Sequence, residues 1–131
     1  MELAIEKRRT PKRVSALRIL SDRIEVLREF RADMPIHMVS VFLAVAMRPG
    51  VLQCDLPELV GISQSSVSRN VYALGKHDRH GKPGLGLVEQ RCGPTGARSP
   101  EIHLTKAGRE LAKRLMAADI TRDLINHDAA S

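Results

Sequence analysis

Hydroxyl, amide and basic side chains share one short stretch of the sequence, residues 63–76. If this stretch is a helix, successive residues turn by about 100°, and Val67, Val71 and Leu74 fall on one apolar side. The opposite side offers hydrogen-bonding groups and positive charge, which suit the noncovalent binding of an anionic partner. Its members are Ser65, Arg69, Tyr72 and Lys76, with Ser66 and Ser68 beside them and Gln64 at the start.

Two further groups of residues could do different chemistry. His77, His80 and Cys92 are metal-ligating residue types, but His-x-x-His is not a recognised zinc pair and a single cysteine follows it. Cys54 and Cys92 are more simply ordinary thiols than redox-sensing ones. We therefore predict that the protein holds no metal and no cofactor.

Signatures of catalysis are absent from the sequence. It contains no glycine-rich phosphate loop, no nucleophile elbow and no pair of carboxylates at a useful spacing. Asp22, Glu25 and Glu29 are more simply the solvated face of a helix. We therefore predict that the chain is not an enzyme.

The charge balance favours an anionic partner. The 131 residues include 21 lysines and arginines against 15 acids, a net charge of +6, and such small basic domains often bind nucleic acid. Only 2% of the residues are aromatic, which argues against a pocket for a planar ligand. A membrane span is not expected, because the longest apolar run, Ile36–Met47, is too short. Met1–Thr10 has no secretory signal pattern, so we expect a cytoplasmic protein.

Helical patterns fill the first part of the chain. Thr10 and Pro11 cap and open a helix whose apolar residues recur every three or four positions. On so short a chain, this stripe calls for a partner helix from a second copy. Pro35 opens a second helix, to about Arg48, which is apolar all round between Met38 and Met47 and is expected to be buried on every side. The stripe of the first helix consists of Val14, Leu17, Leu20, Ile24, Leu27 and Phe30.

Residues 55–74 have the pattern of a helix-turn-helix. Asp55-Leu56-Pro57-Glu58 matches a capping box at the start of the first, short helix. Gly61 can take the left-handed conformation of the turn, and Ser63 caps the second helix. A second helix with an aliphatic inner face and a polar, basic outer face suits the DNA major groove, where Arg69 can bind guanine through two hydrogen bonds.

The remaining segments predict strands, a loop and a last helix. Val51–Gln53 favours a short strand, and Leu87–Arg91 and Glu101–Leu104 are expected as two strands around a turn-rich tip at residues 92–100. The loop at residues 75–86 carries four glycines and a basic cluster. Thr105 caps a helix from Lys106 to about Asn126, with Leu111 and Leu115 on its buried side.

This order of elements is the plan of a winged helix. We predict a mainly α fold with a small β-hairpin: a winged helix-turn-helix with long N- and C-terminal helices. One domain is expected over residues 11–126, with the helix-turn-helix at 55–74 and the wing at 87–104. Residues 1–10 and 127–131 are expected to be flexible.

Over roughly residues 35–115 the sequence resembles the MarR family of bacterial winged-helix regulators. Three stretches carry the resemblance: residues 55–69, Leu87-Val88-Glu89, and Arg98 followed after a strand by residues 104–110. It implies a recognition helix in the major groove, a wing arginine in the minor groove, and terminal helices that build a homodimer. By position, Arg98 matches the wing arginine. The chain departs from the family pattern in Gly96, where an acid is usual, in Pro57, in its longer loop at 75–86 and in its early end, which implies a smaller dimer-forming part.

Together these observations predict a sequence-specific transcriptional regulator that binds double-stranded DNA as a homodimer and acts as a repressor. A small-molecule effector has no support in the sequence. The alternative left open is a winged-helix accessory of replication or recombination, or a protein-docking module, of a mobile element. In the wing and loop, the expected DNA contacts are Arg79, Lys82, Arg91, Arg98 and Ser99. The expected dimer contacts are Val14, Leu17, Leu20, Ile24, Leu27, Leu111 and Leu115.

Overall fold

The structure is a computed structural model that describes residues 12–77, 80–93 and 99–117. The chain ends expected to be flexible, the helix start at Thr10 and Pro11, and the far part of the last helix lie outside these ranges. Contacts along the chain define two compact units, Met1–Ala32 with Arg114–Ser131, and Asp33–Lys113. The prediction of one domain over residues 11–126 stays a prediction, and each unit is described by itself.

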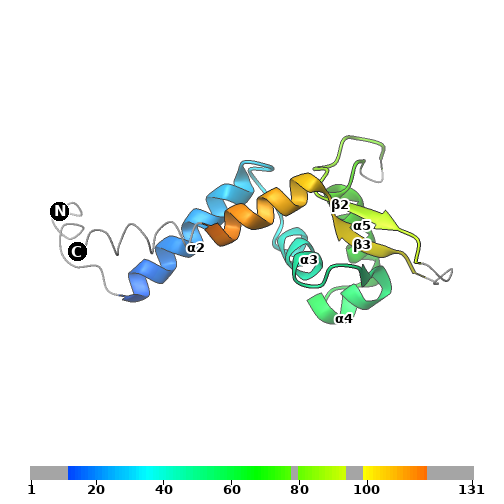
Figure 1. The fold of residues 1–131 in the computed structure, drawn as a ribbon, viewed down its shortest axis with the longest axis horizontal. Coiled ribbons are helices and arrows are strands. Elements are labelled where there is room, and N and C mark those ends of the chain that lie inside the picture. Colours follow the sequence, from blue (N-terminus) through cyan, green and yellow to red (C-terminus); the bar gives the residue numbers. More distant parts are fainter. Residues whose placement is uncertain (1–11, 78–79, 94–98, 118–131) are drawn as a thin grey trace. The chain divides into compact units, whose positions relative to one another are not determined.

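The larger unit contains the predicted helix-turn-helix and wing (Figure 1). The fold is mainly helical with a small antiparallel sheet, which confirms the predicted fold class and extends its hairpin by a third strand. The elements in order are α3 (Ile36–Met47), β1 (Val51–Leu52), the 3-10 turn η1 (Gln53–Asp55), α4 (Leu56–Val60), α5 (Gln64–Leu74), β2 (Val88–Arg91), β3 (Glu101–Leu104) and a helix that is described over residues 106–117, of which 106–113 belong to this unit.

Helix α3 is the centre of this unit and contacts α4, α5 and β3. Val41 and Val45 are fully buried, and Phe42 is 1% exposed. The expectation that α3 is buried on every side is nevertheless wrong. Leu43 is 39% exposed and Met47 is 75% exposed, because the neighbouring elements cover the helix from its other sides only.

The start of α4 also corrects an expectation. Asp55 has helical backbone angles (φ −90°, ψ −16°), and its side chain makes no capping hydrogen bond. The predicted capping box is therefore wrong, because the 3-10 turn η1 runs directly into α4 and leaves Asp55 no extended conformation from which to cap. Pro57 stands in the first turn of the short helix, as predicted.

The sheet has the order β1-β3-β2, with both pairs antiparallel. Ile102 of the central strand lies opposite Val51 on one side and Gln90 on the other, and its side chain is fully buried. The sheet thus packs one face into the core through Ile102 and Val88 and leaves the other face for polar side chains.

The smaller unit pairs helix α2 (Lys12–Arg28) and the turn after it with residues 114–117 of the last helix. Arg23 Nε donates a hydrogen bond to the Leu115 carbonyl oxygen at 3.2 Å. Arg114 Nη2 donates a hydrogen bond to Glu29 Oε2 at 2.7 Å. This hydrogen bond, and to a lesser extent the negative charge of Glu29, raises the pKa of Arg114. Among the residues that the structure describes, no helix combines the length and apolar character needed to cross a bilayer.

Candidate nucleic-acid interface

Helix α5 is held in place by its aliphatic face and by the turn before it. Gly61 ends α4 in the left-handed conformation, with φ 79°. Ser63 Oγ accepts a hydrogen bond from the backbone N–H of Ser66 at 3.0 Å, so the predicted turn glycine and serine cap are both confirmed. The buried residues are Val67, Val71 and Leu74, each at most 2% exposed.

The opposite face of α5 is open to solvent and has no acidic residue. Tyr72 is 46% exposed, and Arg69 makes no hydrogen bond or ion pair with another described residue. An open hollow runs along this face, and five of the seven residues predicted for the recognition helix line it. These five are Gln64, Ser65, Ser68, Arg69 and Tyr72.

The other two predicted residues are placed differently. Ser66 already has a hydrogen-bond partner on the same helix. Its carbonyl oxygen accepts a 2.9 Å hydrogen bond from Asn70 Nδ2, and its hydroxyl lies 3.4 Å from the same nitrogen. Lys76 follows the end of the helix and lines a second hollow, together with Tyr72 and His77 on one side and strand β2 on the other. Tyr72 lines both hollows and so joins them into one surface.

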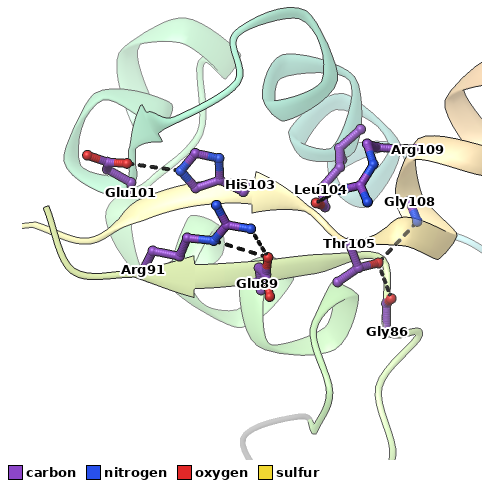
Figure 2. Close-up of polar contacts among 9 residues, drawn as sticks. All are labelled: Gly86, Glu89, Arg91, Glu101, His103, Leu104, Thr105, Gly108 and Arg109. Atoms are coloured by element: carbon purple, nitrogen blue, oxygen red, sulfur yellow. Dashed lines mark hydrogen bonds and ion pairs between the residues drawn. The ribbon is translucent and has the colours of Figure 1, made fainter.

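The wing residues have partners that the sequence pattern did not indicate. Arg91 Nε lies 3.1 Å from Glu89 Oε1, and Arg91 Nη2 contacts the same oxygen (Figure 2). Ser99 Oγ accepts a 2.9 Å hydrogen bond from the backbone N–H of Cys54, which ties the start of the returning strand to η1. Arg98, the expected wing arginine, and Arg79 of the loop lie outside the described residues.

A quartet of polar side chains lies on the polar face of the two-stranded part of the sheet (Figure 2). The register places Glu89 opposite His103 and Arg91 opposite Glu101. His103 Nε2 lies 2.9 Å from Glu101 Oε1, so each strand carries one pair of contacting polar side chains. The alternation of charge at positions 89, 91, 101 and 103 is the signal from which this quartet could have been predicted.

The position of Gly108, in the stretch after the wing, requires a glycine. A Cβ atom at this position would lie 2.1 Å from the Leu87 carbonyl oxygen, so only glycine lets the last helix approach the chain this closely. Arg109, the next residue, donates from Nη1 to the Leu104 carbonyl oxygen at 3.0 Å. The helix after the wing therefore contacts the base of the hairpin, where β2 begins and β3 ends.

The metal-ligating residue types do not assemble in the described part of the chain. Within it, no three His, Cys, Asp or Glu side chains come together in a way that could hold a metal ion. Cys54 and Cys92 are both free and exposed. The prediction of no metal and no cofactor stays a prediction.

The residues predicted for the dimer separate into an exposed and a buried group. The exposed fractions of Leu17 and Leu20 are 64% and 52%. Leu27, Leu111 and Leu115 are at most 9% exposed, so they support the interior of their own chain and leave little surface for a second copy. The exposed group is Val14, Leu17, Leu20 and Ile24, all on helix α2.

Solved structures with a similar fold include proteins described as transcriptional regulators. The chain is similar to RV1404 from Mycobacterium tuberculosis, with a TM-score of 0.66 and 15% identity over 88% of this chain and 73% of that one. It is similar to the multiple antibiotic-resistance repressor MarR from Listeria monocytogenes, with a TM-score of 0.60 and 22% identity over 91% and 75% of the two chains. It is also similar to S. aureus MepR F27L bound to an oligodeoxyribonucleotide, with a TM-score of 0.62 and 15% identity over 87% and 78%.

No protein-family model matches the sequence, and no curated protein matches it. The structural neighbours cover most of the chain, and several are described as MarR-family regulators. The likeness therefore lies in the fold: a MarR-like winged helix with a three-stranded antiparallel sheet.

Proposed function

We propose that this chain is a sequence-specific regulator of transcription that binds double-stranded DNA, and that it acts as a homodimer and as a repressor. The observation that carries the proposal is the division of α5 into two faces. One face is buried in the core, and the other exposes amide, hydroxyl and guanidinium groups with no acid among them. A helix with such an exposed face fits the width of the major groove, where these groups can read base edges.

The residue in the best position for base reading is Arg69. It lies on the exposed face, lines the hollow beside Ser65 and Ser68, and has no partner among the described residues to compete with a base. A free guanidinium can make two parallel hydrogen bonds to guanine. The neighbouring hydroxyls and Gln64 then contact bases or phosphates on either side.

The dimer is supported by the exposed stripe of α2. Val14, Leu17, Leu20 and Ile24 repeat every three or four residues and are 42–64% exposed in the single chain. A stripe of large apolar side chains on one side of a helix is stable in water when a second helix covers it. A second copy of this chain supplies such a helix, and two copies would present two α5 helices to two half-sites of one DNA site.

A footprint on the DNA upstream of the protein's own gene tests this proposal. The expected result is one protected region with two symmetric half-sites about one helical turn apart. Protection without symmetry would contradict the homodimer. No protection there and no preferred sequence elsewhere would contradict the regulatory function and favour a protein-docking module.

A further inference from the structure

The connection between α5 and β2, described over residues 75–77 and 80–87, returns to the end of the recognition helix. Two of its backbone N–H groups donate hydrogen bonds to the last two carbonyl oxygens of α5: that of Leu85 to Ala73 at 3.0 Å, and that of Leu87 to Leu74 at 2.7 Å. Gly86 donates to the Gly75 carbonyl oxygen at 2.8 Å. The end of the loop therefore satisfies the carbonyl groups at the C-terminus of α5, which places it firmly beside the helix.

Close packing also fixes this position. A Cβ atom at Gly84 would lie 2.1 Å from the Gly75 carbonyl oxygen and 2.9 Å from that of Ala73. Gly84 in turn donates its N–H to the Lys76 carbonyl oxygen at 2.9 Å, and His77 and Pro83 form an isolated antiparallel bridge. The two ends of the loop are thus paired with each other, through residues 76–77 and 83–84, which form its paired base. Lys76 belongs to this paired base, and Lys82 directly precedes it.

Exposed side chains of basic residue types lie on this paired base and in the described part of the loop beyond it. Lys76, His77, His80 and Lys82 are all open to solvent. Lys76 and His77 line the hollow that Tyr72 joins to the outer face of α5. Lys76 therefore brings positive charge next to the face that carries Arg69. The one carboxylate among the residues lining this second hollow, Glu89, is already paired with Arg91.

We propose that residues 76–77 and 80–82 form a second DNA-contacting surface that binds the phosphate backbone next to the base pairs read by α5. This inference rests on the proposed DNA-binding function. A lysine ammonium group is a point charge without the planar fork of arginine, so it binds phosphate well but distinguishes bases poorly. The surface adds affinity and positions α5, while the choice of sequence stays with α5.

Salt dependence of binding tests the proposal. The full-length parent and the single variants Lys76→Gln, Lys82→Gln and Lys113→Gln are titrated at several salt concentrations. Two duplexes of equal length are used: one selected by the parent from a random library, and one with the selected sequence scrambled. Lys113, an exposed lysine on the last helix, is the matched control because its loss changes the net charge equally.

The expected result is a slope of log K against log salt that is shallower by about one for each loop lysine removed, on both duplexes alike. The preference for the selected duplex stays unchanged, and Lys113→Gln keeps the parent slope. Unchanged slopes for both loop variants would overturn the inference alone, as would a changed preference between duplexes. A loop variant that melts at lower temperature but keeps the parent slope would overturn the inference too, because it would show that the lysine charge only stabilises the C-terminus of α5. A parent that binds neither duplex would overturn the proposed function as well.

Discussion

The hydroxyl of Thr105 donates a 2.6 Å hydrogen bond to the carbonyl oxygen of Gly86 and accepts a 3.1 Å hydrogen bond from the backbone N–H of Gly108 (Figure 2). Its backbone N–H also donates to the Leu87 carbonyl oxygen at 3.0 Å. One side chain therefore caps the last helix and holds it to the chain that enters β2. The start of the last helix and the segment that leads into β2 are therefore joined at this residue.

Replacing Thr105 by valine keeps the side-chain shape but removes both hydrogen bonds of the hydroxyl. We expect Thr105→Val to lower the free energy of unfolding by about 1–3 kcal/mol, because a partly buried carbonyl and a helix N–H lose their partner. Urea unfolding measures this change. Thr105→Ser is the control, since it keeps the hydroxyl, and should lose less than half as much. Equal losses for the two variants would contradict the capping role.

Gly108→Ala is expected to destabilise the protein, although alanine usually favours a helix over glycine by about 1 kcal/mol. The sign reverses because the new Cβ atom would lie 2.1 Å from the Leu87 carbonyl oxygen, and backbone must move to make room. Overpacking of this kind costs about 1–3 kcal/mol or more. Thermal unfolding measures it, with Ala107→Gly as the exposed control at the neighbouring position. A Gly108→Ala protein that melts at or above the parent temperature would show that the close approach is wrong.

Leu17→Glu tests the dimer surface. Leu17 is 64% exposed in the single chain, so its substitution should leave the folded chain intact and place a charge in the helix pair of the dimer. Sedimentation at micromolar concentration is expected to give a dimer for the parent and a monomer for the variant. Leu59→Glu is the control, because Leu59 is 43% exposed but lies on α4, and it should stay dimeric. A monomeric parent bound to DNA as a monomer would contradict the proposal.

Local backbone chemistry explains which parts of the fold could be predicted from the sequence. Gly61 and Ser63 act on residues within one turn of themselves, so the turn, the cap and the bounds of α5 could be predicted. The predicted capping box at Asp55 is wrong because the same motif is equally compatible with a 3-10 turn. Which of the two conformations forms depends on the pairing of β1 with β3, which are far apart in the sequence. Leu43 and Met47 show the same limit: composition indicates a central helix but not which side remains uncovered.

The candidate site divides in the same way. The two faces of α5 follow from helical geometry, so the recognition residues could be selected without a structure. The partner of Ser99 could not, because Cys54 lies 45 residues away from it in the sequence. The pairing of Arg91 with Glu89 was missed, although the alternation of charge along the expected strand is its signal. The folded-back loop depends on Gly84 meeting Gly75, a contact that only the closed loop creates.

The role of Arg69 is the most direct test of the central claim, that the outer face of α5 reads DNA sequence. Binding-site selection from random duplexes is run on the parent, Arg69→Ala, Arg98→Ala and the control Lys113→Gln. We expect Arg69→Ala to lose the preference at one or two positions of each half-site, corresponding to about 1–3 kcal/mol of discrimination. Arg98→Ala should weaken binding and lose only a flanking A·T preference, as expected for a wing arginine in the minor groove. A parent that enriches no sequence, or an Arg69→Ala protein that enriches the parent's sequence with the parent's affinity, would contradict the account.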